Sequence, residues 1–289
     1  MGGESDPLKT FDRVSNPLRL AILRTLARAF SESPVDPSLR YSDLREEVGT
    51  PDKGNFNYHL DRLDGLVRNE SEGYVITSVG LTVVSTVASG ALEPDWEWGP
   101  RGVPGECFFC GDSLTLRHED GHLLLTCDTD EHGLVFSVPP SLVDDHPDEA
   151  VLERVAHVLY QQATAVKHGV CPECKGPVTP EVIPEPRPGG EYFFHGDCHN
   201  CGFQHGFPVG ATALSHPKVL AACAEANVDP RTTPFWTLPW CRVGHEAVVS
   251  EDPFRVTVDV NIDGGEVLSV TLDRSATVVE TESPPIAGE

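Results

Sequence analysis

Apolar residues recur at helical spacing in the first third of the chain. Asp6-Pro7 and Asn16-Pro17 each have the form of a helix start, because Asp and Asn cap helices and Pro is tolerated at the first helical position. An apolar stripe follows the second start, at Leu18, Ile22, Leu23 and Leu26. Ser42 predicts the cap of a second, short helix, which ends at Gly49.

A third helix is predicted over residues 52–63, with Phe56, Leu60 and Leu63 on its buried face. Its other residues largely face outward, and with Arg68 they are the candidate DNA contacts: Lys53, Asn55, Asn57, Tyr58, Arg62 and Arg68. Asn can read adenine with two hydrogen bonds, and Arg can read guanine or hold phosphate. A solvated helix face would show the same periodicity, so the pattern alone leaves both readings open.

Two short strands around a turn at residues 71–73 are predicted next, followed by an apolar helix over residues 79–92. Three helices, a hairpin and a closing helix predict a winged helix-turn-helix over residues 1–92, whose third helix enters the DNA major groove. The closing helix carries an apolar stripe that predicts pairing with a second chain: Val79, Val83, Val84, Val87 and Ala91.

The segment NPLRLAILRTL, residues 16–26, resembles the opening of ArsR-type winged-helix transcriptional regulators. YHLDRL, residues 58–63, is similar to the recognition helix of that family, and residues 41–63 resemble more closely the winged-helix regulators of halophilic archaea. The resemblance implies dimerisation through the first and last helices and binding to an operator.

Two departures from the family pattern limit this resemblance. Gly65-Leu66-Val67 follows Leu63 two residues sooner than in the common pattern, so the exit from the third helix differs. No cysteine precedes Cys107, so the metal-sensing cysteine pair of the family is absent and metal-responsive derepression at that site is not supported.

Residues 107–138 form the first of two predicted metal sites. Cys107-x2-Cys110 can direct two sulfur atoms at one ion, and Cys127 supplies a third. The fourth ligand is open: His132 is the softer and preferred donor, whereas Asp130 holds the symmetric position three residues after Cys127. His118 and His122 are also near in sequence.

The second metal site, over residues 170–210, has Cys171-x2-Cys174, then 23 residues, then Cys198-x2-Cys201. This is a zinc-ribbon spacing, and four thiolates would leave no open position, so the ion would be structural. The alternative at both sites is buried, reduced cysteine without metal. The sequence therefore predicts two structural zinc ions per chain.

The remainder completes an α+β multidomain fold, with zinc-binding residues 107–289 joined to the winged helix by a Pro- and Gly-rich linker at 93–106. An amphipathic helix over residues 148–168 separates the two ribbons, and a helix plus a β-hairpin is predicted within 214–280. The short segments around the cysteines hold few large apolar residues, so metal is expected to replace a core there. This half resembles the C-terminal region of the halophilic-archaeal regulators, which has no assigned ligand.

Charge and targeting signals indicate the salt concentration and the compartment in which the protein is expected to function. The chain has 21 Lys+Arg and 45 Asp+Glu, a net charge of −24, and only five of the basic residues are Lys. Such a surface suits molar salt, which screens repulsion within roughly 3 Å. Residues 1–90 hold 10 basic and 13 acidic residues and are the part where a polyanion meets least repulsion. The absence of a signal peptide or membrane span, with nine cysteines, predicts a cytoplasmic protein that does not bind membranes.

The leading hypothesis is a dimeric transcriptional regulator that binds double-stranded DNA and carries a zinc-stabilised module. An alternative is an adaptor whose zinc ribbons, or the acidic half as a whole, bind a protein partner, with the winged helix serving for dimerisation. A metalloenzyme with an open position at the first site is a third hypothesis. No general base is evident beside that site, so the expectation is that the chain is not an enzyme.

Overall fold

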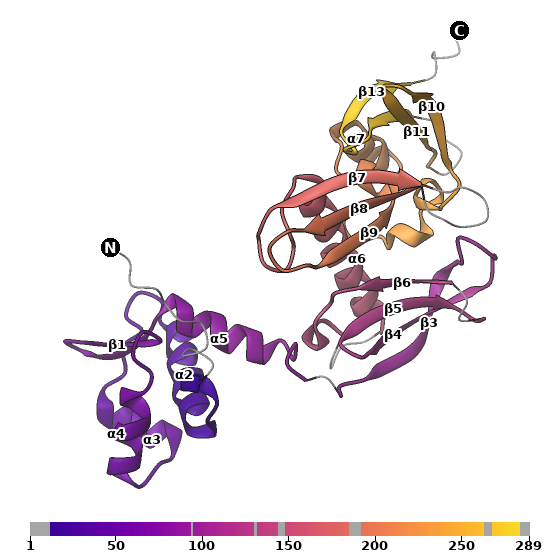
Figure 1. Ribbon diagram of the computed structural model, residues 1–289. Helices are drawn as coiled ribbons and strands as arrows, with labels where there is room; N and C mark the ends of the chain where they lie inside the picture. Colours follow the sequence, from indigo (N-terminus) through magenta and orange to yellow (C-terminus); the bar gives the residue numbers. More distant parts are fainter. Residues whose placement is uncertain are drawn as a thin grey trace. The chain divides into compact units, whose positions relative to one another are not determined.

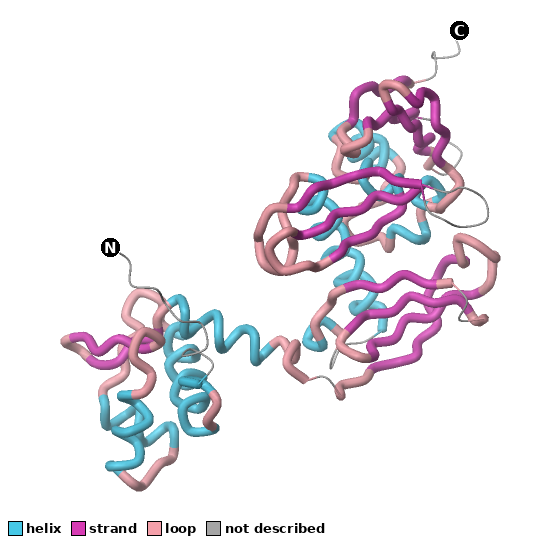
Figure 2. Tube along the Cα trace, in the orientation of Figure 1, coloured by secondary structure: helices cyan, strands magenta, loops and turns pink. Residues whose placement is uncertain are grey.

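The computed structural model describes residues 12–93, 95–129, 132–143, 148–184, 192–262 and 268–283 (Figure 1). The chain divides into two compact units, Met1–Glu93 and Pro94–Glu289, and each has its own hydrophobic core. Figure 2 shows helices in both units, whereas most of the β-strands belong to the second unit. The described sheets are all antiparallel, so the prediction of a mixed α+β protein is confirmed at the level of class. None of the described helices has the length and apolarity that a membrane crossing requires.

Over residues 15–93, the first unit consists of four helices and one hairpin. In chain order these are α2 (Pro17–Glu32), α3 (Tyr41–Val48), α4 (Lys53–Asp61), β1 (Val67–Glu70), β2 (Gly73–Ile76) and α5 (Ser78–Ala88). Strands β1 and β2 pair in the register Val67 with Ile76, and Leu39 adds one bridge to Tyr74.

Capping explains where these helices begin. The Asn16 side chain accepts hydrogen bonds from the backbone N–H groups of Leu18 and Arg19, as predicted from Asn16-Pro17. Asp52 caps α4 in the same way. The prediction that Ser42 caps α3 is wrong: the cap position is Arg40, without a side-chain bond, because the helix begins one residue before Ser42. The Asp6-Pro7 start lies outside the described residues.

The core of this unit is formed by apolar side chains from α2 to α4, from the segment after α4 and from the hairpin. Its fully or nearly fully buried members include Ile22, Leu23, Leu26, Leu44, Phe56, Leu60, Leu63 and Leu66. Gly80 of α5 packs so closely that a Cβ atom there would lie 2.5 Å from the backbone oxygen of Leu66. Glycine at this position therefore lets α5 lie against the exit from α4.

The second unit begins with a four-stranded sheet in the order β3-β4-β5-β6. Its strands are β3 (Trp98–Glu106), β4 (Ser113–Glu119), β5 (His122–Cys127) and β6 (Gly133–Phe136). The prediction of a linker over 93–106 is wrong for residues 98–106, which form β3. The prolines of this segment indicated a linker, but an edge strand also tolerates Pro where its register is irregular. The pairing of β3 with β4 shifts between Trp98 and Arg101 and again between Val103 and Glu106.

Helix α6 (Asp148–Lys167) follows the short 3-10 helix η1 (Pro140–Leu142) and precedes a three-stranded sheet. That sheet has the order β7-β8-β9, formed by β7 (Val178–Pro184), β8 (Tyr192–Cys198) and β9 (Gln204–Pro208). Beyond it come the 3-10 helices η2 (Val209–Ala213), η3 (Phe235–Thr237) and η4 (Pro239–Cys241), and helix α7 (Pro217–Glu225).

A last sheet runs in sequence order, β10-β11-β12-β13. Its strands are β10 (Glu246–Glu251), β11 (Phe254–Val260), β12 (Leu268–Asp273) and β13 (Val278–Glu282). The predicted hairpin is the central pair, with Val256 opposite Leu272, and its turn at residues 263–265 lies outside the described residues. Strands β10 and β13 extend that pair on both sides.

One continuous core joins the three sheets and the helices of this unit. It includes the cysteines Cys107, Cys127, Cys171 and Cys198 together with Phe194, Phe207, Trp236 and Trp240. The expectation that metal must replace a core around the cysteines is therefore wrong: the strands beside the cysteine turns contribute buried side chains to a core that also includes residues of α6 and of the C-terminal segments.

Candidate functional site

Two clusters of metal-ligating side chains lie in the second unit. The first centre comprises Cys107, Cys110, Cys127 and His132, and the second centre comprises Cys171, Cys174, Cys198 and Cys201. Within each cluster the ligand atoms all lie within 4.8 Å of one another. The structure thus brings together the eight ligands predicted from the sequence.

A repeated backbone turn presents these side chains. The N–H of Cys107 donates to the oxygen of Asp112, and the equivalent bonds, each to the residue five positions on, begin at Cys127, Cys171 and Cys198. The fifth residue of the turn has a left-handed backbone at Gly111, Lys175 and Gly202, with φ of 80°, 62° and 76°. At Cys107, Cys171 and Cys198 this turn, which we call a knuckle, directs two side chains three residues apart to the same side. At Cys127 the second ligand is His132, five residues on.

Each centre combines a knuckle before a strand with a turn at the end of the next strand. In the first, Cys107 and Cys110 precede β4, and Cys127 ends β5. In the second, Cys171 and Cys174 precede β7, and Cys198 ends β8. Antiparallel pairing of the two strands therefore brings residues distant in sequence to one point.

His132 completes the first centre within the described residues. Its Nδ1 lies 3.8 Å from the sulfur of Cys127. His118 is buried and its Nε2 lies 3.0 Å from the oxygen of Val138, while Nδ1 of His122 lies 2.8 Å from the oxygen of Asp120. Asp130, the alternative fourth ligand, lies outside the described residues.

Hydrogen bonds distinguish the sulfur atoms of the second centre. The side-chain amide of Asn200 and the backbone N–H of Gly176 each donate to the sulfur of Cys174 at 3.4 Å, and they lower the pKa of that thiol to about 6. The backbone N–H of Phe203 lowers the pKa of Cys201, but desolvation and the neighbouring thiols outweigh it and raise that pKa to about 12. Crowded thiols resist a second ionisation because thiolates repel, and a bound cation would remove this repulsion.

The first centre shows a similar division. Desolvation raises the pKa of Cys127, but hydrogen bonds from Thr129 and from the backbone at Thr129 and His132 outweigh it, and the pKa falls to about 6. The backbone N–H of Asp112 lowers the pKa of Cys110, but desolvation, the other thiols and the Asp112 carboxylate raise it to about 12. The carboxylate oxygen of Asp112 lies 3.3 Å from the sulfur of Cys110.

Both donor sets suit a borderline-soft ion in tetrahedral coordination. Each centre supplies four ligands, from two turns, so an ion held there has its coordination positions filled by the protein. Such closed sets stabilise a fold and do not present an open position to a substrate.

Sequence comparison shows where this unit belongs. A family model described as Domain of unknown function (DUF7351) matches residues 104–278. The chain belongs to this family. A second model, Domain of unknown function (DUF7347), matches residues 7–87. Neither description states a function, and no curated protein matches the chain.

The candidate DNA contacts precede the DUF7351 domain, in the segment that the second model matches. All six predicted residues are exposed: Lys53, Asn55, Asn57, Tyr58, Arg62 and Arg68. They come from α4, from the residue after it and from β1, and Phe56 and Leu60 bury the opposite side of α4. The geometry is therefore an exposed polar face on a buried apolar stripe.

Several of these side chains already have intramolecular partners. The hydroxyl of Tyr41 donates to the side-chain oxygen of Asn57, and the guanidinium of Arg62 lies 5.2 Å from the ring centroid of Tyr58. Arg68 pairs with Glu70 at 2.9 Å. Tyr41 was not predicted from the sequence; its place as the first residue of α3 gave no sign that it would reach α4.

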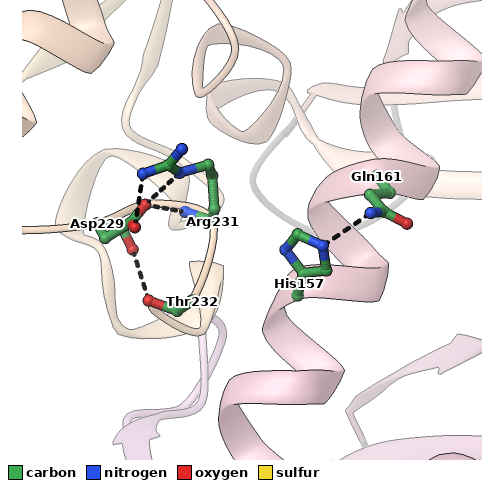
Figure 3. A network of polar contacts seen from close by, with 5 residues as sticks. All are labelled: His157, Gln161, Asp229, Arg231 and Thr232. Atoms are coloured by element: carbon green, nitrogen blue, oxygen red, sulfur yellow. Dashed lines mark hydrogen bonds and ion pairs between the residues drawn. The ribbon is translucent and has the colours of Figure 1, made fainter.

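A further polar cluster in the DUF7351 domain involves α6 and the loop after α7 (Figure 3). The carboxylate of Asp229 accepts hydrogen bonds from the guanidinium of Arg231 at 2.8 and 2.9 Å, and this pairing lowers the pKa of Asp229. On α6, Nε2 of His157 lies 2.7 Å from the amide nitrogen of Gln161. The carboxylate is thus engaged within its own loop and holds that loop's conformation.

Proposed function

We propose that the chain is a DNA-binding transcriptional regulator of the ArsR-like winged-helix type, with zinc ions in its C-terminal module. The order of elements in the first unit supports this, because α2, α3, α4, the β1–β2 hairpin and α5 follow one another as the elements of a winged helix do. In this proposal α4 is the recognition helix and the hairpin is the wing.

The exposed polar face of α4 carries the proposal. Lys53, Asn55 and Arg62 offer a cation for phosphate, an amide for adenine and a guanidinium for guanine or phosphate. Asn55 is the better candidate for bidentate contact with adenine, because the side-chain oxygen of Asn57 already accepts from Tyr41. Arg68, in the proposed wing, forms a salt bridge with Glu70. Its guanidinium can contact a DNA phosphate once Glu70 moves away from it.

Binding to duplexes selected from a random library in molar KCl tests this proposal. High salt removes most nonspecific attraction, so the retained affinity reports base and shape readout. Asn55→Ala combined with Arg62→Ala is expected to weaken binding at least about fivefold, because one good base contact contributes about 1–3 kcal/mol.

The matched control is Arg24→Ala, which removes one exposed cation from α2. It is expected to leave the affinity for the selected duplex nearly unchanged. If the α4 variant binds like the parent chain, or if selection enriches no sequence, α4 is not a DNA reader and the proposal fails.

Zinc is the ion that the two centres fit best. Sulfur-rich tetrahedral sets with one imidazole or none are typical of structural zinc, whereas Mg²⁺ and Ca²⁺ require oxygen ligands. The sheet register that gathers Cys171 and Cys174 with Cys198 and Cys201 supports a structural role for the second ion.

A further inference from the structure

The two centres occupy equivalent places in two similar arrangements of strands. Counting from the first cysteine of each knuckle, Cys110 is equivalent to Cys174, and Asp112 is equivalent to Gly176. Counting from Cys127 and Cys198, Thr129 is equivalent to Asn200. The fourth ligand also differs, His132 in the first centre and Cys201 in the second. The backbone bonds of the knuckles match, so the surroundings of Cys110 and Cys174 differ through these neighbouring side chains.

At the second centre, Cys174, one of two exposed cysteines, accepts from two N–H donors. The sulfur of Cys174 accepts from the backbone of Gly176 and from the amide of Asn200, each at 3.4 Å. A Cβ atom at position 176 would lie 2.7 Å from the Cβ of Asn200, so glycine is what allows that amide to come close. Donors of this kind stabilise a thiolate bound to metal.

At the first centre, the equivalent cysteine faces a carboxylate. The sulfur of Cys110 donates to the carboxylate of Asp112, 3.3 Å away, as a thiol can. Metal binding removes the thiol proton, and the contact then joins two negative groups. The three thiolates of this centre carry more negative charge than a zinc ion carries positive charge. The carboxylate of Asp112 adds to this excess and so disfavours the zinc-bound state.

The same carboxylate offers a route for the ion to leave. Asp112 places an oxygen beside the sulfur of Cys110, and carboxylate oxygen is itself a zinc ligand. It can therefore replace Cys110 during exchange. Exposure does not explain a difference between the centres, because Cys110 and Cys174 are both exposed.

We propose that the first centre is a reversible zinc site, which exchanges its ion with free zinc in solution, while the second centre retains its ion. This inference rests on the proposed binding of zinc at both centres. It assigns Asp112 as the residue that makes the first site exchangeable, and Asn200, whose equivalent in the first centre is Thr129, as a residue that holds the second ion.

The test measures zinc release from the full chain, loaded with two ions as counted by elemental analysis, into excess chromophoric chelator. Two phases of one zinc each are expected, with rates that differ at least about tenfold, the lower end of the effect that outer-shell partners have on metal affinity. Cys198→Ser removes a ligand of the second centre, and its remaining ion is expected to leave in the fast phase.

Substitutions beside the ligand cysteines then assign the cause of the difference in release rate. Asp112→Asn is expected to slow the fast phase about tenfold. Asp128→Asn is the control: it removes the same charge beside Cys127, but the described contact of Asp128 is a backbone bond to Ser113, not one to sulfur. Asn200→Asp is expected to accelerate the slow phase.

Equal release rates for both ions, or a fast phase that persists only when the second centre is intact, would overturn the proposal. So would equal effects of Asp112→Asn and Asp128→Asn. A chain that binds no zinc at all also overturns it, and the loading measurement identifies that case as a failure of the proposed zinc binding itself.

Discussion

At the scale of single residues, close backbone contacts determine which positions accept a side chain. Gly210 in η2 is buried, and a Cβ atom there would lie 1.8 Å from the backbone oxygen of Trp240. Gly196 in β8 is similarly close, since a Cβ atom would lie 2.3 Å from a methyl carbon of Val166. At both positions the absence of a side chain lets segments distant in sequence pack together.

We predict that Gly210→Ala destabilises the second unit by at least about 1–3 kcal/mol, the usual cost of overpacking a core. The neighbouring atom is backbone and cannot turn aside. The measurement is the midpoint of denaturant unfolding followed by tryptophan fluorescence. Gly102→Ala in β3 is the control, because a Cβ atom there meets nothing within 4 Å, and it is expected to change stability by less than about 0.5 kcal/mol.

The cysteine pattern predicted both centres because ligand spacing is a local property of a knuckle. The neighbours of the sulfur atoms were not predicted. Asp112 and Gly176 stand at equivalent positions in the printed sequence, but the sequence does not show that the side chain of Asp112 turns back to Cys110. Asn200 reaches Cys174 only because β7 and β8 pair in a particular register.

At the scale of secondary structure, the predictions succeeded where a local signal marked an element. Asn16 begins α2 and Gly49, with φ of 74°, ends α3, both as predicted. Strands β3, β10 and β13 were missed. Each is an edge strand, paired on one side only, and few of its residues are buried. Its sequence therefore lacks a clear apolar alternation and resembles that of a loop or an acidic surface.

The cap of α2 gives a prediction at this scale. Asn16→Ala removes the acceptor for the N–H groups of Leu18 and Arg19, and it is expected to lower the stability of the first unit by about 1 kcal/mol. Thermal unfolding followed by circular dichroism at 222 nm measures the effect. Asn16→Asp retains an acceptor and is expected to keep most of that stability; equal losses in the two variants would contradict the capping account.

At the scale of the whole chain, all four tryptophans, at positions 96, 98, 236 and 240, lie in the second unit. Their fluorescence therefore reports that unit alone. Removing zinc with a chelator is expected to lower its unfolding temperature, because an ion that binds only the folded state stabilises it, by about 4 kcal/mol at a thousand times its Kd.

The unit is not expected to unfold outright without metal, because its core extends well beyond the cysteines. The helical transition of the first unit should not move on chelation, since no predicted zinc ligand lies there. A chelator that lowers both transitions equally, or neither, would contradict this separation. Elemental analysis of the untreated chain is expected to give two zinc ions, and one for Cys198→Ser.

Self-association is predicted from α5. This helix is mostly apolar, yet Gly80 is its one fully buried residue in the described chain, and Val79 is 50% exposed. The stripe predicted from the sequence is divided, because Val83 and Val84 pack partly on the unit's own core. Pairing with α5 of a second copy would bury the remainder.

Sedimentation in molar KCl is expected to give about twice the 31.3 kDa mass of the chain. Val79→Asp should shift the protein toward the monomer. Val135→Asp, a change at an exposed valine of β6 in the other unit, should not. A parent chain that sediments as a monomer at high concentration would contradict the prediction.

The two separate cores have an evolutionary consequence. A segment with its own core can be cut from one gene, joined to another and still fold, and the two family models match separate segments, residues 7–87 and 104–278. The DUF7351 domain is thus suited to move between genes as a unit. Fused behind an unrelated DNA-binding module, it is expected to keep its fold and the proposed zinc binding.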